Sequence, residues 1–323
     1  MYSGWKKVDS QVSFTLRLED LVAISFFLIY LIAFAIFGGP GKDLPVWQVI
    51  GSGVLAVGLL LSIVLARQAI SLQQYSLQSK PDRKDSISPY ATIIRDWLPF
   101  LTILAMYYSL WGDITHILVP RDRDAALIAW DQRLFGMQAS VALQRYTHPI
   151  LTAWMKFAYN FHPFNVPLVG LFVYLRRPRS NFREMMAGLM VIGFFGYFGY
   201  LLVPAVGPLY TLKNYYHVDL GSMQFMDYVK IRRDVFPSLH AGIAFLVWIY
   251  AYRNSRLLFL ILSPLILSLW VSTVYLRQHY LIDVVVGLAL APLCVLLADW
   301  LFKHYADVRL SFSIPGELRS GPR

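Results

Sequence analysis

The strongest constraint on the fold of this chain is a series of about eight apolar stretches, each long enough to cross a bilayer as a helix. A helix of about 18 or more apolar residues spans the hydrocarbon core of roughly 30 Å and satisfies its own backbone polar groups there. With 57% hydrophobic residues, the composition agrees. The chain is therefore predicted to be an all-α, polytopic membrane protein with spans at residues 20–38, 46–66, 98–118, 150–175, 184–205, 238–253, 257–276 and 280–302.

The placement of Lys and Arg predicts the orientation of these helices. With the N-terminus inside, the inner segments carry 18 basic residues and the outer segments carry 10. Because basic residues are retained on the inner side, we expect a multi-pass cell-membrane protein with both termini in the cytoplasm. The net charge of +10 comes mostly from inner loops that meet anionic lipid head groups, so the bilayer, and not nucleic acid, is the expected partner.

Composition also divides the chain into parts. Residues 1–75 hold two N-terminal anchor helices, residues 76–97 form a polar cytoplasmic linker, and residues 303–323 form a cytoplasmic tail. Between them, residues 98–302 make a six-helix core. Within the core, residues 121–149 mix apolar and charged residues at helical spacing, which predicts helices lying on the outer membrane surface.

Two histidines are predicted to meet at the outer face of the membrane. The 38 residues between His240 and His279 suffice for one helix across the bilayer and one helix back. Asp283 follows His279 by four residues at a helix start, so its carboxylate can accept the imidazole N–H and fix the tautomer. Ionisable side chains at such a depth usually have a function.

Cationic and hydroxyl side chains near this pair predict a site for a phosphoryl group. Positive charge would come from Lys213, Lys230, Arg232, Arg233 and Arg277, and hydrogen bonds from Ser238 and the amides of a helix start. A nucleophilic histidine, an acidic histidine and cationic oxygen binders amount to metal-free phosphoryl transfer. Neither a metal nor another cofactor is therefore expected. The single cysteine, Cys294, leaves no intramolecular disulfide or cysteine cluster available.

Structural roles remain open alternatives for these residues. His240, His279 and Asp283 could form a polar cluster without catalysis, and Arg277 could be an interfacial residue that reaches for water. Lys156 and His162 could make hydrogen bonds between helices, and the basic residues of the outer loop could simply be solvated or bind lipid head groups.

The sequence around the two histidines resembles the last two motifs of the type 2 phosphatidic acid phosphatase superfamily, P-S-x-H and S-R-x5-H-x3-D. The first motif is matched by Pro237, Ser238 and His240, and the second by Ser272, His279 and Asp283 at the right spacing.

This resemblance implies a role for each matched residue. His279 would attack phosphorus to give a phosphohistidine, Asp283 would orient His279, and His240 would protonate the leaving oxygen. Ser238 would help to hold the phosphate. The six-helix core of the superfamily would cover roughly residues 98–302.

Two departures from the superfamily concern phosphate binding. Thr273 stands where the second motif has Arg, and the usual Lys-x6-Arg-Pro motif has no counterpart, because Arg177-Pro178 has Gly170 in place of the Lys and lies on the predicted cytoplasmic side. A phosphoryl group in a partly dry pocket needs compensating charge. The expected substitutes are Arg277 first, then Lys213, Arg233 and Lys156, with Tyr210 and His162 completing the predicted substrate-binding set.

At both departures the sequence is similar to one branch of the superfamily, the branch that contains the inositol phosphorylceramide synthases. VPAVGPLY at 203–210 stands in the place of the missing motif, and YNFHPF at 159–164 and WDQRLFG at 130–136 also look similar to that branch. Its members transfer a phospho-headgroup between lipids. We therefore expect an integral membrane lipid phosphotransferase with its active site on the extracytoplasmic side.

Two other functions remain open. One is a lipid phosphate phosphatase that hydrolyses phosphatidate-like or polyprenyl phosphates. The other, of a different class, is a lipid-phosphate binder or transporter without catalytic activity. In each case the small ligand would be a phospholipid or another lipid phosphate.

Overall fold

The computed structural model describes residues 5–37, 89–109, 119–221, 233–305 and 307–319. Within these residues, three helices are long and apolar enough to cross a membrane: α9 (Arg179–Leu202), α13 (Arg256–Tyr275) and α14 (Leu281–His304). The predicted span at 46–66, most of the linker, and the cationic candidates Lys230 and Arg232 lie outside the described residues.

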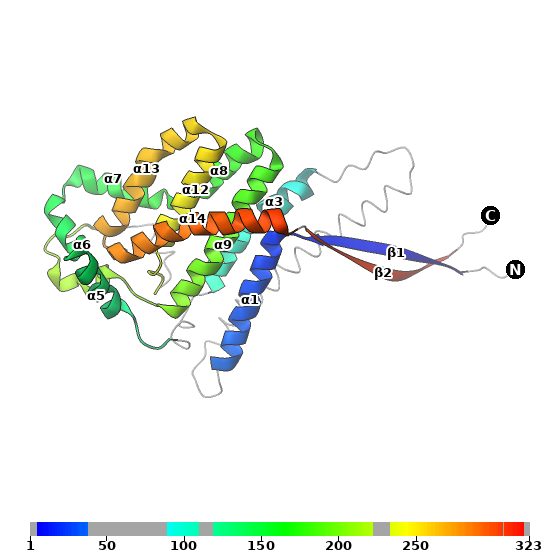
Figure 1. Cartoon of the computed structure of the whole chain (residues 1–323), viewed down its shortest axis with the longest axis horizontal. Helices are drawn as coiled ribbons and strands as arrows, with labels where there is room; N and C mark the ends of the chain where they lie inside the picture. The colour runs from blue at the N-terminus through cyan, green and yellow to red at the C-terminus, as the bar shows by residue number, and fades with distance from the viewer. Residues whose placement is uncertain (1–4, 38–88, 110–118, 222–232, 306, 320–323) are drawn as a thin grey trace.

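Helix α9 occupies the centre of the helical body (Figure 1). It packs against α1 (Leu18–Phe37), α3 (Pro89–Ser109), α12 (Leu239–Asn254) and α14. Its glycines allow this, because small residues let neighbouring helices approach closely. Gly196 faces Leu239 of α12 and Gly188 faces Tyr250 of α12, with no room for a methyl group beside either neighbour unless that neighbour shifts.

The outer surfaces of α13 and α14 are apolar, in contrast to the surface of a water-soluble protein. Large aliphatic side chains such as Leu257, Leu260, Leu293 and Leu296 are more than 60% exposed. Exposed apolar surface of this extent is expected where the surrounding solvent is hydrocarbon, and it agrees with helices that span a membrane.

The predicted span at 150–175 is divided into two helices, α7 (Pro149–Asn160) and α8 (His162–Arg176). The break at Phe161 has a local cause. Pro163 lacks a backbone N–H and disfavours helical backbone at the residue before it, so a continuous helix is interrupted there. As a result His162 lies at the start of α8, next to His240 of α12.

Short helices in residues 121–149 confirm the helical pattern predicted for this segment. They are α5 (Asp124–Phe135), α6 (Ala139–Ala142) and the 3-10 turn η1 (Leu143–Tyr146). Helix α5 contacts α14, and α6 contacts α13. Together they cover one end of the bundle, where the loop after α9 forms α10 (Pro208–Thr211) and η2 (Lys213–Tyr215).

A two-stranded antiparallel ribbon, which the sequence analysis did not anticipate, projects from the helical body (Figure 1). Strand β1 (Trp5–Leu16) pairs with β2 (Val308–Arg319), and Leu16 is opposite Val308. Apolar and polar residues alternate in VSFTL and in VRLSFSI, the period of a strand. The helical body is otherwise all-α as expected, and the pairing brings the start of α1 and the end of α14 to the same end of the bundle.

Candidate active site

The two predicted motifs lie side by side at one end of the bundle, here called the site end. Ser238 caps α12, because its hydroxyl accepts a hydrogen bond from the Ala241 N–H at 3.3 Å. The Ser238 N–H donates to the carbonyl of Asp283 at 3.0 Å, which ties α12 to α14. Gly287 makes this approach possible, since a Cβ at that position would collide with the Ser238 carbonyl.

The imidazoles of His279 and His240 contact each other directly. His279 Nδ1 is 2.9 Å from the carbonyl oxygen of Val235, and since a carbonyl only accepts, Nδ1 must carry the proton. The lone pair of His279 is therefore on Nε2, which lies 3.3 Å from His240 Nδ1. His279 is 2% exposed, so the fold presents its unprotonated nitrogen to the second histidine in a buried setting.

Asp283 lies near His279 but does not accept the hydrogen bond expected from the sequence. Its Oδ2 is 3.7 Å from His279 Nδ1, an ion-pair distance that exceeds a hydrogen bond. The same oxygen accepts the Tyr280 N–H at 2.8 Å and so caps α14. The carbonyl of Val235 takes the place of the expected acceptor, because the loop before α12 approaches Nδ1 more closely than the carboxylate does.

Asp131 of α5 supports the start of α14. Its two oxygens accept the N–H groups of Leu281 and Ile282 at 3.0 and 2.8 Å, although it is 150 residues away in the sequence. Asp131 is 1% exposed, and burial raises the pKa of its carboxyl above the usual range while the two N–H groups oppose that shift. It belongs to the WDQRLFG segment, but sequence reasoning gave it no role.

A second carboxylate of α5 supports the turn that follows α9. Asp124 accepts the N–H groups of Val206 and Gly207 at 3.0 and 2.9 Å, and the hydroxyl of Tyr280 at 2.7 Å. Helix α5 thus holds the turn and the start of α14 together through two buried acidic side chains. Spacing alone could not have identified them, since their partners are backbone groups distant in sequence.

The turn VPAVGPLY, which stands in the place of the missing motif, packs against the loop that carries His279. Gly207 has a φ of 96°, a conformation that L-residues rarely adopt, and a Cβ there would be 3.0 Å from the Gln278 carbonyl oxygen. The Leu209 N–H donates to the Arg277 carbonyl at 2.9 Å. The turn therefore contacts the loop that carries His279 through backbone atoms.

The two buried arginines among the predicted phosphate binders have protein partners. Arg233 Nε is 2.5 Å from Asp122 Oδ1, and Nη2 donates to the Val119 carbonyl at 2.8 Å. The Arg277 guanidinium lies 3.9 Å above the Tyr216 ring, and its Nη2 donates to the Val218 carbonyl at 2.6 Å. Burial lowers the pKa of Arg277 from its usual value. Arg277 stands one residue before Gln278, which lines the histidine pocket.

The remaining predicted binders lie at different distances from the histidines. Lys213 and Tyr210 are exposed on the loop that follows α9. Lys156 is half-buried on α7, and its Nζ lies beside Gly221. The His162 ring contacts the His240 ring, with centroids 4.5 Å apart, so His162 is the one of these four that joins the histidine pair.

Two hollows that share lining residues adjoin the histidines. A narrow pocket of about 10 Å³ is lined by Tyr107, Tyr159, Asp234, Val235, His240, Gln278 and His279. A wider cavity of about 260 Å³ shares Tyr107, Asp234 and His240 with it and extends between α3, α8, α9 and α12 along mostly apolar side chains. Sequence reasoning missed Asp234, which is 7% exposed and accepts a hydrogen bond from the Tyr107 hydroxyl at 2.8 Å.

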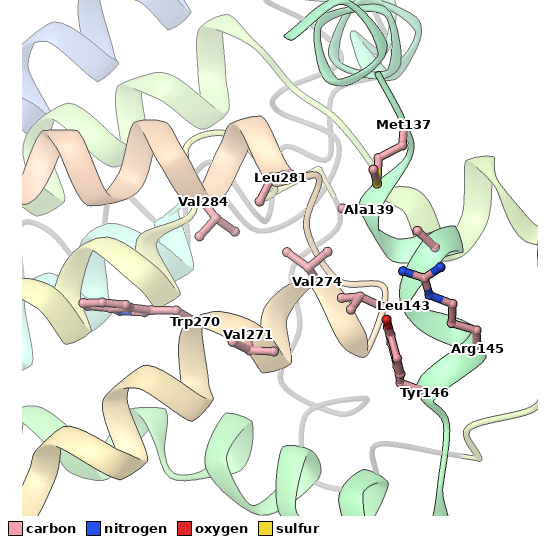
Figure 2. A pocket seen from close by; sticks show the side chains of 11 residues that line it. Met137, Ala139, Leu143, Arg145, Tyr146, Trp270, Val271, Val274, Leu281 and Val284 are labelled. Atoms are coloured by element: carbon pink, nitrogen blue, oxygen red, sulfur yellow. The ribbon is translucent and has the colours of Figure 1, made fainter. Parts of the chain in front are cut away.

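A further apolar cavity of about 390 Å³ lies between α13, α14 and residues 137–146 (Figure 2). Figure 2 shows Val271 and Val274 of α13, Leu281 and Val284 of α14, and Leu143 of the outer segment around it. Neither histidine lines it, and its walls are almost wholly apolar, so it is no candidate for the chemistry.

Comparison with known proteins agrees with this arrangement. Residues 125–297, more than half of the chain, match the PAP2 superfamily, and the chain belongs to that superfamily. It is thus a membrane enzyme of the superfamily that includes phosphatases and phosphotransferases.

Among individual proteins, the chain is similar to the phosphoinositol dihydroceramide synthase of Bacteroides thetaiotaomicron, with 24% identity over 164 residues. These residues make up 44% of this chain and 52% of the relative, so the chain spans about half the length of that curated protein. Among solved structures, LpxE of Aquifex aeolicus aligns with a TM-score of 0.40 and 16% identity, covering 50% of this chain and 92% of that one. The resemblance seen in the sequence, to the superfamily and to the inositol phosphorylceramide synthase branch, is confirmed.

Proposed function

We propose that this protein is a lipid phosphotransferase that moves a phospho-headgroup from one lipid to the hydroxyl of another, through a phosphohistidine at His279. The observation that carries the proposal is the composition of the histidine pocket. Among the described residues that line it, none is Lys or Arg, and one is an aspartate.

This composition favours a phosphodiester over a phosphomonoester. A monoester carries close to two negative charges at neutral pH, which would be costly to bury beside Asp234 without cations. A phosphodiester carries one charge, and Arg277, which precedes the pocket residue Gln278 in the sequence, is the cation that we assign to it. An enzyme that attacks a phosphodiester and retains the headgroup is a transferase when the acceptor is an alcohol.

The geometry suits His279 as nucleophile. In the first step, His279 Nε2 attacks phosphorus, the bond from phosphorus to the lipid oxygen breaks, and that oxygen takes a proton from His240. The Val235 carbonyl holds His279 Nδ1–H at 2.9 Å and stabilises the positive imidazole formed on attack. Asp283, 3.7 Å from the same nitrogen, adds a negative charge on that side.

The contact between the histidines indicates that the site is closed in this structure. A nucleophile and its target atom approach to about 3 to 3.5 Å before reaction. The nitrogens are 3.3 Å apart, so a phosphorus atom cannot lie between them until the rings separate. We infer that substrate binding displaces His240 from His279, which also releases the lone pair of Nε2 from its hydrogen bond.

The similar bacterial protein is named for a phosphoinositol group and a dihydroceramide. That name supports a transfer between lipids here and suggests probes: phosphatidylinositol labelled at phosphorus as donor and dihydroceramide as acceptor, in detergent micelles. We expect labelled product to depend on the acceptor. Phosphate or inositol phosphate released at the same rate with and without acceptor would make the protein a hydrolase.

A binder or transporter is separated from an enzyme by the phosphohistidine itself. Quenching in alkaline SDS after brief mixing with labelled donor should leave label on the wild-type chain that is stable to alkali and released by acid, and none on His279→Ala. Equal turnover by both chains would contradict the proposed role of His279.

The proposal includes about eight spans, both termini inside and the site outside. Cys294 is buried, so single added cysteines can report sidedness. A membrane-impermeant maleimide should label Lys213→Cys in intact cells and should label Ser180→Cys only after lysis. The reverse pattern would invert the predicted topology.

A further inference from the structure

We propose that Asp234 is the acceptor-binding residue of this enzyme and that it recognises the hydroxyl of a membrane-soluble alcohol beside His240. This inference rests on the proposed transferase function and adds to it the site and the chemistry of acceptor recognition.

The position of Asp234 carries the argument. Together with Tyr107 and His240, it lines both the narrow histidine pocket and the apolar cavity between α3, α8, α9 and α12. If the apolar chain of a lipid occupies the cavity, its polar head lies beside Asp234, next to the histidines of the narrow pocket. Asp234 is 7% exposed and its Oδ2 is held by the Tyr107 hydroxyl at 2.8 Å, so its orientation is fixed.

The charge of Asp234 selects the kind of ligand. A carboxylate accepts hydrogen bonds and repels the phosphate oxygens, so it is unsuited to bind the phosphoryl group. It is well suited to an O–H or N–H donor, since hydrogen bonds to an ionised acceptor are roughly twice as strong as neutral ones. A hydroxyl held by Asp234 would be aligned beside His240 without competing for the phosphate position.

The cavity explains how an alcohol would outcompete water. Its volume of about 260 Å³ is slightly below the range of about 300 to 1,000 Å³ for ligand pockets, and its walls include Phe100, Ile103, Val166 and Leu189. Such walls favour an apolar chain and offer few partners to water. His162 lines the same cavity, and its Nδ1 is buried without a hydrogen-bond partner among the described residues, so it provides a second polar contact for the alcohol head.

The second half of the reaction then balances as follows. The acceptor oxygen attacks phosphorus, the P–Nε2 bond breaks, and its electron pair returns to His279. The hydroxyl proton passes to His240, which lost a proton to the leaving oxygen in the first half. Asp234 holds the acceptor through this exchange and keeps its own protonation state.

The decisive experiment measures the two half-reactions separately in Asp234→Asn. With labelled phosphatidylinositol alone, the variant should form acid-labile phosphoenzyme at close to the wild-type level. With dihydroceramide added, transfer should fall about 10- to 100-fold while hydrolysis of the phosphoenzyme by water persists, which is the effect of losing one charge-assisted hydrogen bond. Asp219→Asn is the matched control, because Asp219 is an exposed loop carboxylate bound to the Gly221 N–H, and it should behave as wild type.

Tyr107→Phe provides a second variant, since it keeps the ring and removes only the hydroxyl that holds Asp234. It should raise the KM for dihydroceramide several-fold with phosphoenzyme formation retained.

Two results would overturn the inference and leave the transferase proposal intact: unchanged transfer in Asp234→Asn, or an equal loss of phosphoenzyme formation and transfer, which would place Asp234 in the first step. A wild-type enzyme that hydrolyses its donor and never transfers would instead overturn the transferase proposal, and this inference with it.

Discussion

The two ends of the helical bundle both bury carboxylates, but they satisfy them in different ways. At the end opposite the site, the fully buried side chain of Asp96 lies between Arg17, at 2.8 Å, and Arg179, and Asp20 pairs with Arg95. At the site end, Asp124 and Asp131 accept backbone N–H groups and a tyrosine hydroxyl.

The difference indicates a separate role for each end of the bundle. Arginines neutralise the carboxylates at the opposite end and tie the starts of α1, α3 and α9 into one charged cluster. At the site end, backbone N–H groups and a tyrosine hydroxyl take the place of arginines around Asp124 and Asp131, so these carboxylates fix loops. Asp234 lines the pocket. We therefore expect substitutions at the opposite end to change stability, and those at the site end to change activity.

Removing the nucleophile should give the largest effect. His279→Ala should lower turnover of a labelled lipid phosphodiester by at least about 10³-fold, because the covalent route is lost. Thermal unfolding in detergent should change far less than activity, because the hydrogen bond from the Ser238 N–H to the Asp283 carbonyl still ties α12 to α14. A variant with residual phosphohistidine would contradict the assignment.

Asp96→Ala tests the opposite end. Removing one member of a buried ion-pair cluster leaves Arg17 and Arg179 without their shared partner and should cost about 3 to 5 kcal/mol of unfolding free energy. The matched control is Asp299→Ala, because the Asp299 side chain is 21% exposed whereas that of Asp96 is fully buried, and this variant should cost less than about 1 kcal/mol. Equal costs in the two variants would remove the contrast between a structural end and a catalytic end.

Gly287→Ala tests the alignment of the two histidines. The added methyl group would force α14 away from the Ser238 carbonyl, and a displacement of about 1 Å between reacting groups can cost roughly 10²-fold in rate. Val285→Ala, on the exposed face of α14, should retain activity. A fully active Gly287→Ala enzyme would show that the spacing of α12 and α14 is not critical.

Asp131→Asn should have the smallest effect, a loss of about 1 kcal/mol for the weakened cap of α14 and a several-fold lower kcat with little change in KM.

The pH dependence of the contribution of Asp131 to stability has a definite sign. Because the pKa of Asp131 is raised in the folded protein, its favourable contribution is complete below the unfolded value of 3.8 and is lost as pH rises through the folded pKa. The stability of wild type minus that of the variant should therefore decrease as pH rises above about 3.8, and thermal unfolding across this range measures it. A constant difference would contradict the raised pKa.

Much of the helical body and the centre of the site followed from the sequence, because both rest on local signals. Long apolar runs predicted α9, α13 and α14, and the spacing of His240, His279 and Asp283 placed the motifs on one face. The divided span at 150–175 was missed although Pro163 gave a signal, since overall hydrophobicity outweighed it. The ribbon was not predicted, because each alternating segment is short and its partner strand lies at the other end of the sequence.

The supporting residues were beyond the reach of local signals. Asp124 and Asp131 act through backbone groups far along the chain, and Asp234 is a single acidic residue in a polar loop. Arg233 was predicted to bind phosphate, but its charge pairs with Asp122, which only the fold could show. The catalytic and binding roles of all these residues remain predictions for the experiments above.

The ribbon has a consequence for how the molecule is made. Strand β1 leaves the ribosome before its partner β2, which is synthesised only after the described helices from α1 to α14. Until then β1 presents unpaired backbone edges, which can pair with another chain. The ribbon can therefore form only after the helices that carry the site have been made. A fluorescent tag placed before β1 would thus disturb the pairing of β1 with β2, a late step of folding.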